Sequence, residues 1–197
     1  VKLRRYQDII DFYISRRINW NVLNMLNTRY VVTPQGQVQR NPEAYGNVWF
    51  VDDYKMVSNP DGEILALNEM DIRHTAVVDS SKWAGMLDDF AIEVDTTATI
   101  SEIYQRPYNP GYVKYESHSK TDQMAVFSEV FYAPDWRAYI DGKPADHFRA
   151  NYILRAMIVP AGDHIIEFRD EAPLLHKLDK VSLVFSLLIL VALIGCI

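Results

Sequence analysis

The sequence predicts an α+β protein that is mainly β. The expected architecture is a β-sandwich-like (jelly-roll-like) domain, with a helical and α/β lead-in before it and one transmembrane helix after it. Three observations predict this class: apolar residues at helical spacing near the start, short β-rich runs between turn residues from Ala91 onward, and a final stretch without charge. We therefore expect a lead-in over residues 1–90, a sandwich over 91–175, and a juxtamembrane segment with a transmembrane helix over 176–197.

The lead-in carries two helical signals. Residues 5–26 place apolar side chains three and four positions apart, and Arg16, Arg17 and Asn19 predict a break within that helix. Residues 59–68 begin with an asparagine cap and a proline at the first helical position, which predicts a second, shorter helix. Between and after these helices we expect strands or β-rich stretches at 30–33, 47–57 and 74–78, and an exposed, turn-rich loop at 34–46.

The second half of the chain alternates short β-rich runs with turn residues. Seven strands in a row suit two packed antiparallel sheets, which is the reason for predicting a sandwich. Turn signals stand at 109–111, 141–142 and 161–162. The expected strands are 98–105, 112–118, 124–132, 136–140, 146–149, 152–159 and 164–169.

One hairpin is predicted in detail, within the segment FYAPDWRAYIDGKPA at 131–145. A two-residue type I′ turn needs positive φ at both central residues, and Asp141-Gly142 is among the pairs that adopt it most readily. Pro134 and Pro144 lie on either side, where a missing amide donor limits further strand pairing. Trp136 and Tyr139 differ in parity along the strand, so one is expected to face the core and the other to be more exposed.

The last seventeen residues, 181–197, contain no charged side chain. At helical rise they cover roughly 26 Å, close to the ~30 Å of a bilayer core. A buried core helix is the alternative, but a helix without any polar stripe is unusual in a domain of this size. We therefore expect a membrane span here, although Lys177 and Lys180 against Asp179 do not fix its orientation. Since residues 1–10 do not form a secretory signal peptide, we expect the chain to be the carboxy-terminal piece of a larger membrane protein.

Composition and motif content argue against several classes of binding partner and functional site. A formal net charge of -6 disfavours nucleic acid as a partner, and the single Cys196 excludes an intrachain disulfide or a cysteine-based metal site. The acidic pairs 52–53 and 88–89 are interpreted as solvated turn residues, because neighbouring strand residues point to opposite faces. Neither a nucleotide-binding glycine cluster nor a hydrolase nucleophile motif is present. Five histidines occur singly and predict no metal site: His74, His118, His147, His164 and His176.

Four segments in series resemble the carboxy-terminal region of bacterial YfhO-type membrane proteins. They are LNTRYVV (26–32), NPEAYGNVWFVDDY (41–54), SEVFYAPDWRAYIDGKPA (128–145) and RANYILRAMIVPAGDHIIEFR (149–169). The resemblance covers nearly the whole chain and ends in the last transmembrane helix. It implies a mainly β extracytoplasmic domain on the bacterial cytoplasmic membrane, attached to an upstream transmembrane region.

The same resemblance implies a function for the parent protein, which is the transfer of sugars from a polyprenyl-phosphate carrier to cell-envelope polymers. In such glycosyltransferases the catalytic carboxylate belongs to a loop between early membrane helices. We therefore expect no catalytic residue and no cofactor in this chain. Donor sugar, acceptor polymer and oligomeric state are not specified by these residues.

Two functional hypotheses follow, and an independent soluble hydrolase is a weaker third. In the first, the domain is a noncatalytic accessory part of the glycosyltransferase that contacts envelope glycan through exposed aromatic rings, with Asn109 or Arg137 binding hydroxyl groups. In the second, it is a structural or partner-binding cap without a glycan ligand, which a broad exposed apolar patch would favour. The expected partners are membrane lipid at 181–197, the upstream transmembrane region and, in the first hypothesis, glycan. The candidate ligand-binding residues are Trp49, Tyr108, Trp136 and Tyr139.

Overall fold

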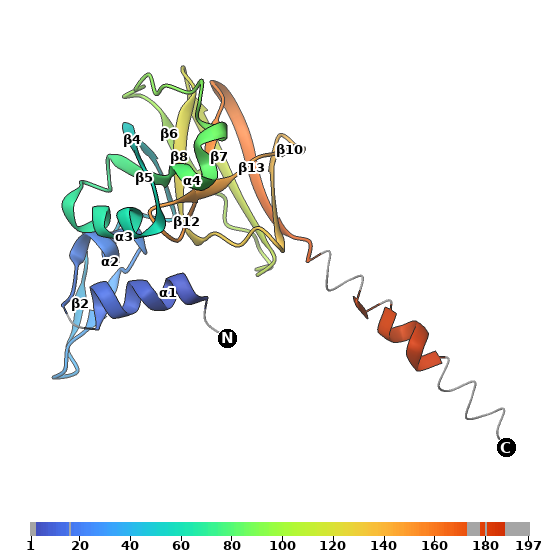
Figure 1. The fold of residues 1–197 in the computed structure, drawn as a ribbon, viewed down its shortest axis with the longest axis horizontal. Coiled ribbons are helices and arrows are strands. Elements are labelled where there is room, and N and C mark those ends of the chain that lie inside the picture. Colours follow the sequence, from blue (N-terminus) through green and yellow to red (C-terminus); the bar gives the residue numbers. More distant parts are fainter. Residues whose placement is uncertain (1–2, 16, 173–177, 180, 188–197) are drawn as a thin grey trace.

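Two antiparallel β-sheets pack face to face, and a helical lead-in covers the other face of the smaller sheet (Figure 1). The structure is a computed structural model that describes residues 3–15, 17–172, 178–179 and 181–187. Its architecture confirms the mainly β, sandwich-like α+β part of the predicted fold class. The larger sheet has the strand order β10-β9-β13-β7-β6, and the smaller sheet has the order β11-β12-β8-β3.

Neighbouring strands in each of the two large sheets run antiparallel. In the five-stranded sheet the bounds are β6 Thr99–Glu102, β7 Tyr112–Ser119, β9 Trp136–Ile140, β10 Lys143–Ala145 and β13 Gly162–Asp170. In the four-stranded sheet they are β3 Val48–Val51, β8 Gln123–Val130, β11 Phe148–Ala150 and β12 Leu154–Val159.

An aromatic cluster fills the space between the two large sheets. Tyr115, Phe127 and Phe168 are fully buried there, and the Phe127 ring lies 4.9 Å from each of the other two ring centroids in edge-on geometry. Such arrangements place the positive edge of one ring against the negative face of another, which favours this packing beyond the area buried. The cluster holds the five-stranded sheet against the four-stranded one.

The lead-in builds a second cluster on the opposite face of the four-stranded sheet. Ile9, Val22 and Leu67 from its helices are fully buried against Trp49 and Val126 of that sheet. The helical elements are α1 Arg4–Ile9, the π-helical turn η1 Ile10–Ile14, α2 Trp20–Met25, α3 Pro60–Glu69, α4 Ser80–Trp83 and the 3-10 turn η2 Ala84–Met86. The lead-in also holds the antiparallel pair β1 Tyr30–Val32 and β2 Val38–Arg40, and the parallel pair β4 Asp53–Val57 and β5 Thr75–Asp79.

Strand β3 belongs to the sandwich, although it lies within the lead-in of the sequence. Val48 pairs with Phe127 and Val51 pairs with Met124, so β3 forms one edge of the four-stranded sheet. As a result this sheet is covered on both faces, and residues 123–127 of β8 are buried without interruption. The two predicted regions on either side of residue 90 thus share one sheet and one core cluster.

Several local predictions are confirmed and others are wrong. Asp141 and Gly142 have φ of 51° and 75°, and Ile140 pairs with Lys143 across them, so the predicted two-residue hairpin turn is present. The Asn59 side chain accepts a hydrogen bond from the Gly62 amide at 2.8 Å and caps α3 as expected. The loop expected at 34–46 instead contains β2, which forms because β1 supplies its backbone partner. Helix α4 was not anticipated.

The C-terminal segment is described only in part. Residues 178–179 and 181–187 are helical, and Leu183, Val184 and Phe185 are each more than half exposed. Within the described residues, the structure has no helix whose length and hydropathy would suffice to cross a membrane. The predicted span over 181–197 extends beyond these residues, since 188–197 lie outside the described part of the chain.

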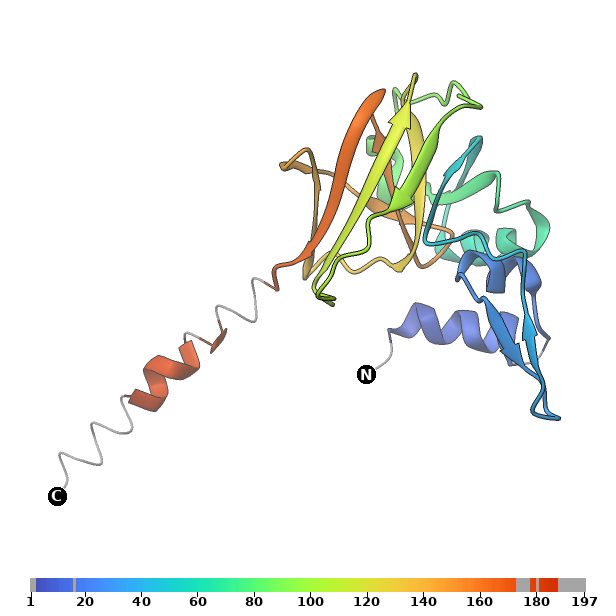
Figure 2. The same cartoon turned by 180° about the vertical axis from the view of Figure 1, so that it is seen from behind.

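The helices α1 and α2 and the β1–β2 pair lie at one end of the molecule, which we call the helix end (Figures 1 and 2). In both views strand β13 lies on the side of the sandwich away from α2 and the β1–β2 pair.

Candidate functional site

A hollow of about 440 Å³ lies beside the predicted hairpin β9–β10. We call it the hairpin hollow. It is lined by residues of β9 and β10, of the turn before β11, and by Glu171, which directly follows β13. Its polar lining combines a guanidinium, a phenol, an imidazole and two carboxyl groups, from Arg137, Tyr139, His147, Asp146 and Glu171.

Tyr139 lies on the outer face of the five-stranded sheet. Its hydroxyl donates a hydrogen bond to the Glu171 carboxylate, and this bond is the main reason why the pKa of Tyr139 is raised. The Arg169 guanidinium lies 4.2 Å from the centroid of the Tyr139 ring, in cation–π geometry. The ring is therefore held in place by two fixed partners.

Arg137 and His147 complete the polar wall of the hairpin hollow. The Arg137 guanidinium donates to the Ala133 carbonyl oxygen at 2.5 Å and to that of Trp136 at 3.1 Å. The His147 Nε2 atom is buried and makes no hydrogen bond with any described residue. Burial, followed by the nearby charge of Arg155, lowers the pKa of His147 from 6.5 to about 4. The imidazole is therefore neutral at pH 7 and can accept or donate a hydrogen bond.

Trp136 faces the opposite way, as the parity argument predicts. It packs against the cluster between the sheets, and the guanidinium of Arg155 lies 4.2 Å from its ring. Arg155 is itself 2% exposed and forms an ion pair with Glu129 at 2.8 Å. Trp136 thus packs between the two sheets, which is a structural role.

The other two candidate residues do not join the hairpin hollow. Trp49 is only 2% exposed and packs edge-on against Tyr45 at 5.2 Å, so it presents too little surface to stack on a sugar. Its position follows from the two covered faces of the four-stranded sheet. Tyr108 is 84% exposed in the loop between β6 and β7, where the Asn109 side chain accepts a hydrogen bond from the Gly111 amide. Tyr139 and Arg137 are therefore the two predicted residues that one site brings together.

A buried ionic group that sequence reasoning missed links the lead-in to the sandwich. Glu63 is fully buried, and its carboxylate accepts hydrogen bonds from Arg5 at 3.1 Å and from the Tyr152 amide at 3.0 Å. Arg149 lies 3.9 Å from both Glu63 and the buried Asp79. Burial raises the pKa of Glu63 despite these partners. We call these five residues the Glu63 network and assign it a structural role, because its ionic groups are paired within the fold.

Histidines and acidic residues form pairs within the described part of the chain. His74 meets Asp52 at 2.5 Å, and His118 meets Asp163 at 2.6 Å. Within the described residues no three or more histidine, cysteine or acidic side chains come together in a way that could hold a metal ion.

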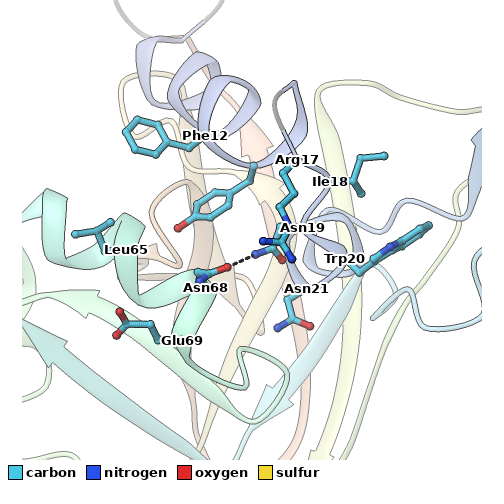
Figure 3. A pocket seen from close by; sticks show the side chains of 10 residues that line it. Phe12, Arg17, Ile18, Asn19, Trp20, Asn21, Leu65, Asn68 and Glu69 are labelled. Carbon is cyan, nitrogen blue, oxygen red and sulfur yellow. Dashed lines mark hydrogen bonds between the residues drawn. The ribbon is translucent and has the colours of Figure 1, made fainter.

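A second hollow, of about 600 Å³, lies between the first helices and α3 (Figure 3). We call it the helix-end hollow. Asn19 donates to Asn68 at 3.0 Å across it, and the apolar side chains around it are markedly exposed. Their exposed fractions are 58% for Phe12, 47% for Ile18, 49% for Trp20 and 55% for Leu65.

Comparison with models of protein families, with curated proteins and with solved structures found no match for this chain. The resemblance to YfhO-type proteins therefore stays a prediction from the sequence.

Proposed function

We propose that this chain is a noncatalytic, extracytoplasmic accessory domain of a multi-span membrane glycosyltransferase, and that the hairpin hollow is where it contacts envelope glycan. The parent would take its sugar from a polyprenyl-phosphate carrier, and its catalytic carboxylate would lie upstream of this chain. The domain would then hold or orient the acceptor polymer near the membrane.

The observation that carries the proposal is the composition of the hairpin hollow. Sugar sites combine an aromatic ring, which packs on the apolar face of a pyranose, with planar polar groups that pair with hydroxyls. Tyr139 supplies a ring that is fixed by Arg169 and Glu171, while Arg137 and the carboxyl groups supply donors and acceptors. Such preorganised groups are the usual features of a ligand site.

Calorimetric titration of the full chain in detergent micelles tests this proposal. The probes are glucose, galactose and N-acetylglucosamine oligosaccharides. We expect binding by the wild type and a loss of about tenfold in affinity for Tyr139→Ala and for Arg137→Ala, as removal of one stacking or hydrogen-bonding partner produces. Tyr30→Ala is the control, because Tyr30 is a tyrosine outside the hairpin hollow, on β1, and is 63% exposed. Unchanged affinity in the Tyr139 variant would remove the hairpin hollow from the proposal.

The accessory role has a separate test. Incubated with lipid-linked sugar and acceptor polymer, the full chain is expected to transfer no sugar. Turnover by the chain alone would overturn the accessory assignment, whatever the titrations show.

A different observation favours the second candidate, a partner-binding cap without a glycan ligand. Phe12, Trp20 and Leu65 expose about half of their surface around the helix-end hollow, whereas exposed apolar groups more often occur singly. Absence of binding to every probe sugar would favour this candidate over the first.

A further inference from the structure

His164 lies near the start of β13 and joins two turns of the sandwich. Its Nδ1 atom is 2.7 Å from a carboxylate oxygen of Asp141, in the turn of the β9–β10 hairpin. Its Nε2 atom is 3.1 Å from the carbonyl oxygen of Ala161, in the turn between β12 and β13. Only 18% of the His164 side chain is exposed, so water does not freely replace either contact.

Both ring nitrogens of His164 therefore face an oxygen atom that accepts hydrogen bonds. A neutral imidazole carries one N–H group, so it can donate to Asp141 or to Ala161 but not to both. Its other nitrogen would then direct a lone pair at an oxygen atom, which is repulsive. The imidazolium ion donates to both oxygens and is the form that fits this geometry.

The backbone around His164 permits this close contact. Gly162 has φ of 123°, and a Cβ atom at this position would lie 3.2 Å from the Nε2 atom of His164. Because Gly162 has no side chain, the ring can approach the Ala161 oxygen. The amide of Ala161 donates to the Asp122 side chain at 2.8 Å, which fixes Ala161 from the other side.

The Asp141 turn attaches strand β10 to the rest of the five-stranded sheet. The Asp141 carboxylate also accepts a hydrogen bond from the Ile165 amide at 2.9 Å, and the Asp141 amide donates to the Ile165 carbonyl oxygen at 2.8 Å. Strand β10 is at the edge of the sheet (Figure 1) and pairs with β9 through three residues, of which Pro144 has no N–H to donate. Since Pro144 and Ala145 line the hairpin hollow, the position of β10 determines one of its walls.

The charges around His164 favour its cationic form. Titratable groups lie near it on its own strand, on β7, in the β7–β8 turn and on the β9–β10 hairpin, namely Asp163, Glu116, His118, Asp122, Asp141 and Lys143. The carboxylates outnumber the cations in this group. The hydrogen bond with Asp141, opposed by burial, raises the pKa of His164 above its ordinary value of 6.5. The stabilisation from these contacts is therefore complete below pH 6.5 and is lost as the pH rises through the folded value.

We propose that His164 is a proton-dependent clamp on the β9–β10 hairpin. The imidazolium ion holds Asp141 and Ala161 together. Loss of its proton at alkaline pH leaves a lone pair facing one of the two oxygens, and the hairpin turn is released. Strand β10 then loses its fixed position, and the hairpin hollow loses one wall. As regulation of glycan binding this inference rests on the proposed function, whereas the clamp itself needs no ligand.

NMR of the full chain in detergent micelles, without sugar, tests the clamp. The Ala145 methyl carbon is attached directly to the backbone of β10, and the His164 ring reports its own titration in the same sample. We expect the Ala145 methyl shift to change with the same midpoint as the His164 ring, above pH 6.5. The order parameter of that methyl axis should decrease from about 0.85 to below about 0.6 across the transition. Ala125, which is buried in β8, should show neither change.

Two variants and a control assign the transition to His164. His164→Gln should remove it, because glutamine does not titrate. Asp141→Asn keeps a residue that tolerates positive φ but carries no charge, so both midpoints should move together to lower pH. His118→Gln is the matched control and should keep the transition, because His118 pairs with Asp163 instead. An Ala145 signal that does not follow His164, that still titrates in His164→Gln, or that keeps its midpoint in Asp141→Asn would overturn the clamp.

Sugar titrations at pH 5.5 and pH 9 separate the clamp from the proposed function. Absence of binding at both pH values would overturn the proposed function and the regulation, while the methyl titration still decides the clamp. Equal affinity at both pH values would overturn the regulation and leave glycan binding intact. We expect binding at pH 5.5 and an affinity about tenfold lower at pH 9, as the loss of one charge-assisted hydrogen bond produces. In His164→Gln the affinity should be the same at both pH values.

Discussion

The Glu63 network allows a specific prediction about stability. Arg149 lies between two fully buried carboxylates, Glu63 and Asp79, and only 14% of its own side chain is exposed. Replacing it by methionine keeps most of the side-chain volume and removes the charge. Both carboxylates then lose a cationic neighbour inside the fold, where water cannot replace it.

The expected cost of Arg149→Met is about 3 kcal/mol in the free energy of unfolding at pH 7. Removing one partner of a buried ion pair costs about 3–5 kcal/mol, and the lower end applies because Arg5 remains 3.1 Å from Glu63. For a chain of this length the loss corresponds to a decrease of roughly 6–12 °C in Tm.

The pH dependence provides a second readout with a defined sign. Burial already raises the pKa of Glu63 above its ordinary value of 4.5, so the native state favours the protonated acid. A raised carboxyl pKa means that stability decreases as the pH rises from 4.5 through the folded value. Loss of Arg149 makes the ionised form costlier still, so the deficit of the variant should be larger at pH 7 than at pH 4.

Urea unfolding followed by tryptophan emission, on the full chain in mild detergent, measures both effects. Arg40→Met is the control, because Arg40 is exposed on β2 and its replacement should change stability by no more than about 0.5 kcal/mol. The double variant with Glu63→Gln should recover part of the loss, since glutamine carries no buried charge. A deficit below about 1 kcal/mol at pH 7, or one that is equal at both pH values, would refute this account of the network.

Three further predictions concern single positions. Trp49→Ala should lower the free energy of unfolding by about 3–5 kcal/mol in urea, because Trp49 fills the core beneath the lead-in; a loss under 1 kcal/mol would contradict its burial. Gly142→Val should cost about 1–2 kcal/mol in the same assay, since φ at Gly142 is 75° and a left-handed backbone is strained for valine; an unchanged midpoint would argue against the turn. Because the pKa of His147 is lowered to about 4, the unfolded state takes up a proton first as the pH falls below 6.5, and stability declines from there toward pH 4. His147→Gln should flatten this decline in thermal unfolding, and parallel curves for the two proteins would count against it.

Local features of the fold could be predicted from the sequence because their causes are local. The hairpin at 141–142 depends on two residues that tolerate positive φ, and the α3 cap depends on one asparagine and one proline. The position of β3 could not be predicted in this way, because its partner β8 lies in the second half of the chain. Residues 38–40 are in a turn-rich stretch and form a strand only through pairing with β1.

The candidate site could be predicted only in part, because alternation along a strand is a local property whereas the covering of a sheet depends on distant segments. Alternation along β9 correctly separated Trp136 from Tyr139, yet it could not show that both faces of the four-stranded sheet are covered and that Trp49 is buried. One signal was available, because the run QMAVF at 123–127 is apolar after its first residue, as expected for a strand buried on both faces.

The position of β3 has a consequence for how the protein acquires its structure. Val48 has no backbone partner until Phe127 has been synthesised, and the cluster around Trp49 also needs Leu154. Contacts between residues so distant in sequence slow the search for the native state, and the early part of a growing chain would expose its apolar helices meanwhile. The helical segment should therefore become resistant to proteases only in nascent chains that extend past β12.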